Sequence, residues 1–442
     1  MQRFILLIGL PFLMVISCTS TRSFGPFPPS STPAEVGDVL FVGEDGNIHT
    51  VDSRTGDSVQ LTTLSERYGG TPHTYDQPHW SPDGQRISYV ATHRSGDRER
   101  TYYLYVHDLR EGRVLTREID GSNPPAYTQW APDSRQLSFL RSSDETGLLE
   151  IVIWDVETDE QIEVLDDRPL FWDWGPTGGF LVAHGGTSSI RGGQGRVSVV
   201  RFEADEPPAV EELDLEAGYF QVPVVAPSGD AFAINVFNEE FGTALGIHDI
   251  ETGEIQLRGA LFSAGAFGWS PDGERIAYIT GLRRPTGEIT GNLRIAERES
   301  GDRLVSSDGI LPPEQSLVQA PSLGGVNAFY WSPDGSMIAF YRSERTEDDN
   351  GTLELRVRLG FIDTVSGRAF ELPSQRPTAS LSGTVIPYFD QYKRSGHLFS
   401  REGGSFLMNV RTEDGRPGIY LVDTGDLSSR LIAHGHMPVY RP

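Results

Sequence analysis

The stretch "WSPDG" begins at Trp80, Trp269 and Trp331 of this 442-residue chain and decides its fold. Its Pro-Asp-Gly core favours a tight turn, because proline fixes φ, aspartate bonds its own backbone and glycine accepts a left-handed conformation. Degenerate copies are "WAPDS" from Trp130, "WGPTG" from Trp174, "VAPSG" from Val225 and "FSREG" from Phe399. A turn that recurs along nearly the whole chain predicts a repeat architecture.

Each turn is followed by a run in which apolar residues alternate, as in "ERIAYIT" (274–280) and "SMIAFYR" (336–342), which is typical of half-buried strands. A second element follows: an apolar strand, an acid and a turn usually ending in glycine, as in "YLYVHDLREGR" (103–113) and "IYLVDTGD" (419–426). The repeating unit is therefore four antiparallel strands, A to D. At this spacing, such a unit is the blade of a β-propeller.

The two ends of the repeat region complement each other. Residues 38–63 have the pattern of strands B, C and D, without a strand A. The segment "HGHMPVYRP" (434–442) places Pro438 and Tyr440 where the motif has Pro78 and Trp80. We therefore predict an all-β propeller of about eight four-stranded blades, closed by 436–442 acting as strand A of the first blade. Seven blades remain the alternative, if the copy at Val225 or Phe399 is not a blade.

The repeat resembles the TolB-type β-propellers, whose blades carry W-S-P-D-G turns, and the resemblance covers residues 38–442. It implies a body that mostly serves binding; in some related peptidases such a propeller gates a hydrolase domain. The sequence contains no G-x-S-x-G nucleophile motif of that hydrolase type.

The N-terminal stretch "MQRFILLIGLPFLMVISC" has a basic start and an apolar run from Phe4 to Ile16 that is too short to span a bilayer. It ends at Cys18, the sole cysteine, and residues 15–18 resemble the bacterial lipobox. The resemblance implies a signal peptide over 1–17, lipidation of Cys18 and an anchor in a membrane outside the cytoplasm. An ordinary secreted protein with a chance cysteine is the alternative.

Residues 18–37 are rich in Ser, Thr and Pro, which predicts a flexible tether before a single propeller domain at 38–442. The chain carries 62 acidic and 37 basic residues, a net charge of −25. This balance opposes nucleic-acid binding, which needs clustered cations. We expect a monomer with no nucleic-acid partner.

The long connections all fall on one side of the predicted ring, because A–B and C–D turns share one face and B–C and D–A connections share the other. The long B–C loops are 92–101, 142–148, 184–195, 280–291 and 342–352, and the long D–A links are 64–77, 117–128, 306–328 and 373–396. Long loops on a rigid scaffold commonly carry function. We predict that this loop-rich face binds the partner, and that trimming 373–396 abolishes capture without changing stability.

Arginine and aromatic side chains, which are enriched at interface hot spots, are frequent in these connections. A merely solvated rim is the alternative. The predicted binding residues are Arg94, Arg98, Arg100, Arg191, Arg283, Arg284, Tyr388, Phe389, Tyr392 and Lys393.

Residues suited to catalysis are sparse. The tryptophans are expected to pack between sheets, and no turn has calcium-site spacing. His434 and His436 lack a clear third metal ligand, and nothing in the sequence brings His73, Asp76 or His184 together with them. We predict no metal, cofactor or catalytic residue. The chain is expected to bind a protein or glycan partner in the cell envelope; the alternative is a lyase or hydrolase with its site at the channel mouth.

Overall fold

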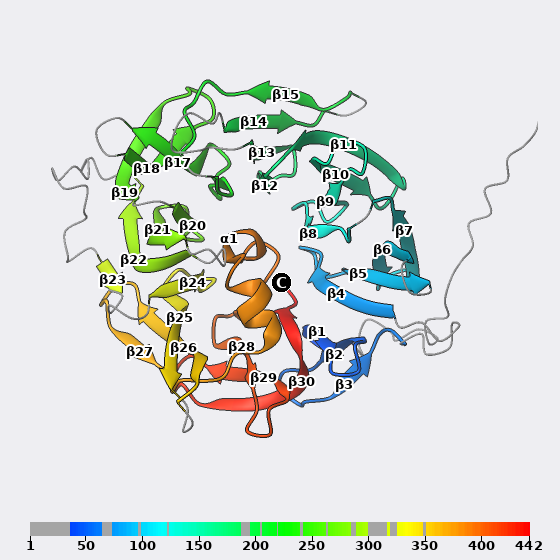
Figure 1. Ribbon diagram of the computed structural model, residues 1–442, viewed down its shortest axis with the longest axis vertical. Coiled ribbons are helices and arrows are strands. Elements are labelled where there is room, and N and C mark those ends of the chain that lie inside the picture. Colours follow the sequence, from blue (N-terminus) through cyan, green and yellow to red (C-terminus); the bar gives the residue numbers. More distant parts are fainter. Residues whose placement is uncertain are drawn as a thin grey trace, which may run out of the picture.

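The computed structural model describes most of the chain from Val36 onward. The described residues are 36–63, 73–95, 99–121, 123–186, 195–203, 206–218, 220–238, 242–261, 264–283, 289–298, 316–318, 325–347 and 351–442. In this part of the chain, strands form eight blades around a central axis (Figure 1). None of the helices described here is long and apolar enough to cross a membrane.

The blades follow one another in chain order. Blades one to four comprise β1 (Val39–Gly43), β2 (Ile48–Val51) and β3 (Ser58–Gln60); β4 (His73–Trp80), β5 (Arg86–Ser95), β6 (Glu99–Asp108) and β7 (Arg113–Ile119); β8 (Ala126–Trp130), β9 (Gln136–Ser142), β10 (Leu149–Asp155) and β11 (Glu160–Asp167); and β12 (Leu170–Trp174), β13 (Phe180–Gly185), β14 (Arg196–Arg201) and β15 (Ala209–Glu212). Blades five to eight comprise β16 (Val224–Val225), β17 (Ala231–Asn238), β18 (Gly242–Asp249) and β19 (Ile255–Leu261); β20 (Ala264–Trp269), β21 (Arg275–Arg283), β22 (Ile289–Glu297) and β23 (Ser316–Val318); β24 (Val326–Trp331), β25 (Met337–Glu347), β26 (Leu353–Asp363) and β27 (Ala369–Glu371); and β28 (Ser405–Arg411), β29 (Pro417–Asp423) and β30 (Ser429–Tyr440).

Strand β30 closes the ring because it belongs to two blades. Its first half pairs with β29, from Val422↔Ser429 to Gly418↔His434, as strand D of the eighth blade. Its second half pairs with β1, as strand A of the first. The predicted closure and the count of eight blades are both confirmed. Tyr440 replaces the motif tryptophan: it is 2% exposed, and its hydroxyl lies 2.8 Å from Ser405 Oγ.

The motif tryptophans join neighbouring blades, as the sequence predicts. Trp269 Nε1 donates to Val224 O and Trp331 Nε1 donates to Gly268 O, each at 2.9 Å and each to the preceding blade. The guanidinium of Arg441, at the end of the closing strand, lies 5.1 Å from the centre of the Trp80 ring. In blades that carry the motif tryptophan, the ring thus packs across the seam against the preceding blade.

The Pro-Asp-Gly turns are held by local bonds and tie neighbouring blades together. In two of them the serine Oγ donates to the aspartate Oδ1 at 2.6 Å, from Ser81 to Asp83 and from Ser332 to Asp334. The glycines that follow have φ of 64° at Gly84 and 70° at Gly335, a region that favours glycine. Bonds between blades also form here, such as Asp83 N to Ser134 Oγ at 2.9 Å.

We expect that deleting 436–442 exposes the unpaired edge of β1 and removes the buried side chain of Tyr440. Removing one buried aromatic side chain already costs about 3–5 kcal/mol, so the free energy of unfolding should fall by at least about 4 kcal/mol. Chemical denaturation followed by circular dichroism measures the change. Deleting only Arg441 and Pro442, which follow β30, is the matched control and should have a smaller effect. An unchanged denaturation midpoint in the longer deletion would contradict closure through β30.

Candidate functional site

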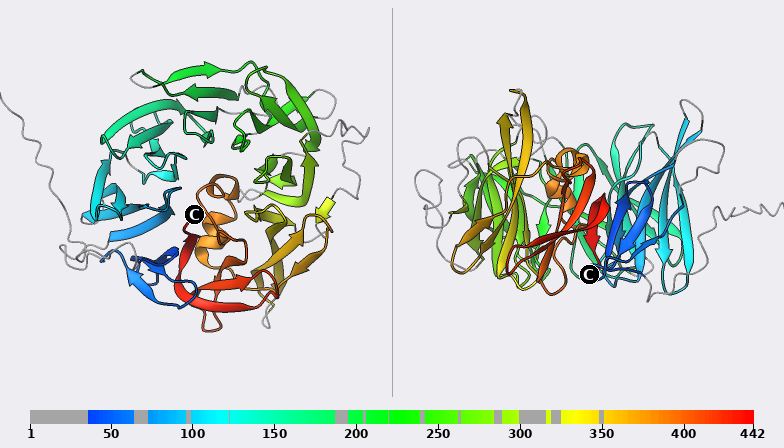
Figure 2. Two further views of the ribbon diagram at one scale, coloured as in Figure 1. Left: turned by 180° about the vertical axis from the view of Figure 1, so that it is seen from behind. Right: turned by 90° about the horizontal axis from the view of Figure 1, so that it is seen from below.

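The centre of the ring is filled by residues 377–397, here called the plug (Figures 1 and 2). The plug contains the π-helix η2 (Leu381–Val385) and the short α1 (Phe389–Tyr392). It connects β27 of the seventh blade to Phe399. Two isolated bridges to β28, from Pro377 to Val410 and from Phe399 to Phe406, stand where the eighth blade would have strand A. The link 373–396, expected to be a surface loop, therefore enters the channel and occupies the place of a missing strand.

Aromatic side chains hold the plug against two blades that lie far apart around the ring. Phe389 is 2% exposed, and its ring centroid lies 5.3 Å from that of Phe329 and 5.4 Å from that of Tyr330. On the other side, Tyr392 lies 5.1 Å from Tyr127. The plug therefore has a hydrophobic core of its own, continuous with the blades.

A buried ion pair anchors the helical turn. Lys393 Nζ lies 2.7 Å from Asp390 Oδ1 and also donates to the backbone oxygen of Phe267. The second carboxylate oxygen of Asp390 accepts from the backbone N–H of Val222 at 3.0 Å. Burial lowers the pKa of Lys393, and the attraction of Asp390 opposes this change. A buried charge is tolerated only when it is paired in this way.

A second ion pair lies at the end of the plug. Arg394 Nη2 bonds Asp173 Oδ2, which also accepts from the backbone N–H of Val225 at 2.7 Å. Burial raises the pKa of Asp173, and Arg394 opposes the rise. Ser395 Oγ donates to Thr128 O at 2.8 Å. Through its polar and aromatic contacts the plug binds at least the third to seventh blades.

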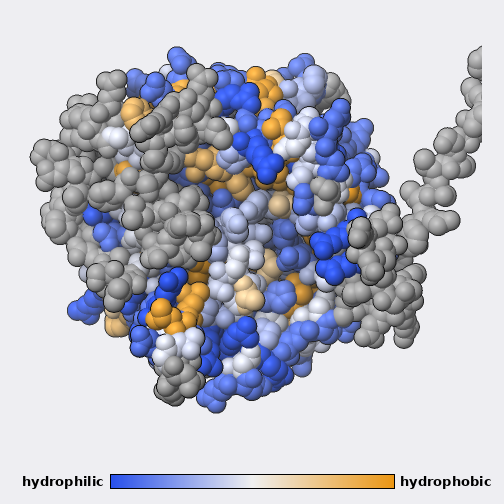
Figure 3. Space-filling view, viewed as in Figure 1, coloured by the Kyte–Doolittle hydropathy of each residue, from blue (hydrophilic) through white to orange (hydrophobic). Residues whose placement is uncertain are grey.

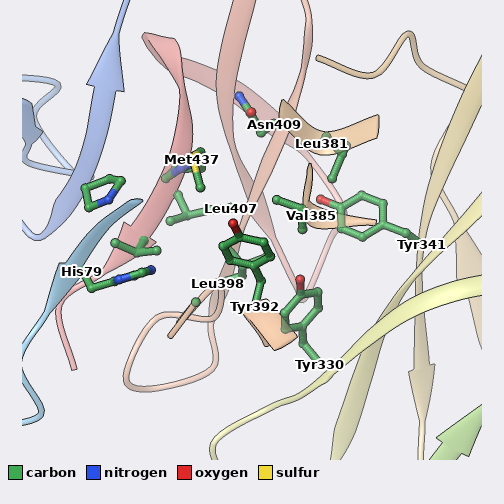
Figure 4. A pocket seen from close by; sticks show the side chains of 14 residues that line it. His79, Tyr330, Tyr341, Leu381, Val385, Tyr392, Leu398, Leu407, Asn409 and Met437 are labelled. Carbon is green, nitrogen blue, oxygen red and sulfur yellow. The ribbon is translucent and has the colours of Figure 1, made fainter. Parts of the chain in front are cut away.

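A cavity of about 60 Å³ remains between the plug and blades one, two, seven and eight (Figure 4). Three tyrosines line it, Tyr330, Tyr341 and Tyr392, together with His79 and aliphatic side chains. Ligand pockets usually measure about 300–1,000 Å³, so this space suits a few water molecules and not a ligand. It is a packing gap at the channel centre.

The predicted binding residues are separated by the fold into distinct environments. Phe389 and Lys393 are buried in the plug, so these two side chains do not face a partner; this corrects their assignment to an exposed loop. Tyr392 is half-buried, whereas Tyr388 is 41% exposed at the loop-rich face.

Arg94 and Arg100 are exposed on the β5–β6 hairpin. The other predicted positions cannot be placed in the same way. The backbone of Arg283 ends β21, but its side chain is not described. Cys18, Arg98, Arg191 and Arg284 lie outside the described residues.

Sequence reasoning missed the function of 373–396 and its partners in the blades. A signal was present, because Leu381, Val385, Ile386 and Phe389 are spaced as on one face of a helix. Asp173, between two tryptophans of a strand A, was a second signal. An acid at such a position needs a buried partner.

The histidines do not assemble into a metal site within the described ranges. No group of three or more His, Cys, Asp or Glu side chains could hold an ion there. His434 Nε2 lies 2.9 Å from Arg416 Nη2. His184 is fully buried with Nδ1 2.9 Å from Gln221 O, and burial lowers its pKa to about 4.

Comparison with known proteins supports the fold. No protein-family model matches the chain. It is 24% identical over 245 residues to the uncharacterized protein Atu1656 of Agrobacterium fabrum, covering 54% of this chain and 68% of that protein. It is 32% identical over 114 residues to dipeptidyl-peptidase 5 of Porphyromonas gingivalis, covering 23% of this chain but only 17% of that enzyme.

Among solved structures, dipeptidyl peptidase 4 of Porphyromonas gingivalis superposes with a TM-score of 0.51 at 12% identity. The match covers 91% of this chain and 60% of the enzyme. At this identity the likeness shows a shared β-propeller architecture and carries no activity over. The narrower TolB-type assignment stays a prediction.

We predict that Phe389→Ala destabilises the protein by about 3–5 kcal/mol, because it opens a cavity in the buried face of the plug. The adjacent change Tyr388→Ala is a matched control: a partly exposed ring should cost clearly less. Denaturant titration of both variants measures the difference. This prediction reverses the expectation that the 373–396 segment is dispensable for stability. Equal denaturation midpoints for both variants and the unmodified protein would support the earlier expectation instead.

Buried histidines should make the protein less stable in mild acid. His79 is 4% exposed with Nδ1 2.9 Å from Thr128 Oγ1, and burial lowers its pKa to about 3. Because the unfolded chain takes up a proton below about pH 6.5 that folded His79 does not, folding stability is lost as the pH falls through that value.

The expected loss from this group between pH 7 and pH 5 is on the order of 2 kcal/mol. His79→Asn retains a nitrogen near the Nδ1 position but does not titrate. Its denaturation midpoint should therefore fall less over this pH range. An identical pH slope in the two proteins would show that His79 does not contribute.

Proposed function

We propose that this chain is an extracytoplasmic, lipid-anchored propeller that captures an acidic protein partner on its loop-rich face. Cys18 would carry the anchor and 18–37 would be the tether. The proposal rests on the different organisation of the two faces and on the charge of one hairpin. Figure 3 views the loop-rich face, where hydrophilic and hydrophobic residues both lie around a filled centre.

The observation that best supports this function is a pair of facing arginines on the hairpin β5–β6. Arg94 and Arg100 lie directly opposite each other in its register, and both are exposed. Neither guanidinium forms an ion pair with a described residue. Like charges facing each other across strands destabilise a hairpin. In a protein of net charge −25, a facing cationic pair that meets no carboxylate among the described residues suits contact with an acidic surface.

Some arginines of the turn face, in contrast, are bonded to the neighbouring blade. Arg86 Nη1 donates to Ser134 O at 2.6 Å and Arg275 Nη2 to Gly335 O at 2.9 Å, so arginines here bond neighbouring blades. On the loop-rich face, β25 and β26 project beyond the ring beside the plug (Figure 2). The plug covers the channel on this side, which favours surface binding over an enzyme at the channel mouth.

A photo-crosslinking amino acid at Tyr388 tests the proposed face in intact membranes. The matched control places it at Val365, which is 88% exposed in a C–D turn of the opposite face. We expect a discrete protein adduct from position 388 only. The same cells with Cys18→Ala should show the protein in the soluble fraction.

Charge reversal then tests the hairpin. Arg94→Glu with Arg100→Glu should lower the adduct yield at least tenfold, since attraction becomes repulsion. Arg54→Glu, in a C–D turn with 88% of its side chain exposed, should leave the yield unchanged. An adduct at Val365 alone, or one insensitive to the hairpin charges, would contradict the proposed face. A glycan in place of a protein in the adduct would change the partner class.

A further inference from the structure

A larger cavity, of about 290 Å³, lies on the other side of the plug from the loop-rich face. Its walls include Trp269 and Trp331, the last residues of β20 and β24, together with Pro333 of the following turn. Since these strands end at the Pro-Asp-Gly turns, the cavity is on the turn face of the channel. The cavity is partly open to solvent, and His397 lines it.

The lining combines aromatic walls with cationic groups. Phe329, Tyr330 and Phe399 complete the aromatic surface begun by the two tryptophans. The charged lining residues are Lys393 and Arg394, and no carboxylate lies among the described residues that line the cavity. This is the reverse of the charge balance of the whole chain, which is −25.

The carboxylates that neutralise these cations lie outside the cavity lining. Asp173 of the fourth blade accepts from Val225 N, and Asp390 of the plug accepts from Val222 N. Only Nη2 of the Arg394 guanidinium is hydrogen-bonded within the described residues, and its Nε is buried without a partner. A buried polar group left unpaired often marks a site for water, an ion or a ligand.

Gly396 leaves the space open. It lines both channel cavities, and a Cβ added there would have a single neighbour within 4 Å, the backbone oxygen of Tyr392 at 3.5 Å. The absent side chain therefore faces unfilled volume. The plug therefore contributes both the cations Lys393 and Arg394 and the unfilled volume beside them.

We propose that this cavity binds a small carboxylate with an aromatic or apolar body. The carboxylate would bond Nη1 of Arg394, which is not hydrogen-bonded within the described residues, as guanidinium groups do with carboxylates. The body would pack against Trp269, Trp331 and Phe399. This site lies on the face opposite the hairpin of Arg94 and Arg100, so it is independent of the proposed partner surface.

Titration calorimetry with 3-phenylpropionate and its neutral amide, 3-phenylpropionamide, tests the ligand class. The acid should bind at least tenfold more tightly than the amide, and its affinity should fall with added salt. Equal affinities, or no binding of the acid at millimolar concentration, would overturn the proposal.

Two variants place the binding in this cavity. Gly396→Leu should fill it and reduce the affinity for the acid at least tenfold. Gly383→Leu is the matched control, because Gly383 is exposed in η2 and a Cβ there meets nothing within 4 Å. Retained binding in Gly396→Leu with lost binding in Gly383→Leu would overturn the assignment.

Arg394→Lys keeps a positive charge opposite Asp173 but removes the planar fork, and it serves if Gly396→Leu does not fold. We expect this change to lower the affinity for the acid several-fold and to leave the affinity for the amide unchanged. An equal effect on both ligands would indicate a structural role alone. The double change at Arg94 and Arg100 should not alter binding of the acid, which separates this site from the partner surface.

Discussion

The structure depends on the backbone pairing of β1 with β30. An open ring would expose the edges of two sheets, and unpaired edge strands invite association with other chains. Here one continuous strand serves as the last strand of the eighth blade and the first strand of the first. The ends of the repeat region are therefore held together by hydrogen bonds and by Tyr440, which packs where other blades have tryptophan.

Closing eight blades leaves a central space that the strands do not fill by themselves. The plug fills it at the cost of burying charge, which is stable only because Lys393 meets Asp390 and Arg394 meets Asp173. Hydrophobic residues of similar volume would serve packing equally well. The retention of two cations in the channel agrees with a binding role for its turn side, where they line a cavity that has room for a small molecule.

The two faces of the ring are thus organised differently. On the turn face, hydrogen bonds join neighbouring blades around the rim, and the larger cavity lies in the channel. The loop-rich face has a covered channel and projecting hairpins, and on one of them Arg94 and Arg100 face each other without an ion pair to any described residue. A body of this kind can present one face to a macromolecule and the other to a small ligand without competition between them.

The sequence by itself determined the propeller and the closing strand, and it favoured eight blades over seven. Turn chemistry and strand alternation are local properties that recur in every blade, so seven copies and one fragment were sufficient. The sequence also identified the side on which the long connections lie. Only the tertiary structure decided what the connection 373–396 does: Phe389 and Lys393 are charged or aromatic like exposed hot-spot residues, and their burial depends on Phe329, Asp390 and Phe267 meeting them in the channel. The helical spacing of Leu381 and Phe389 indicated an apolar face but not what covers it. Phe329 and Phe267 are distant in the chain, and they meet the plug only when the ring closes around it.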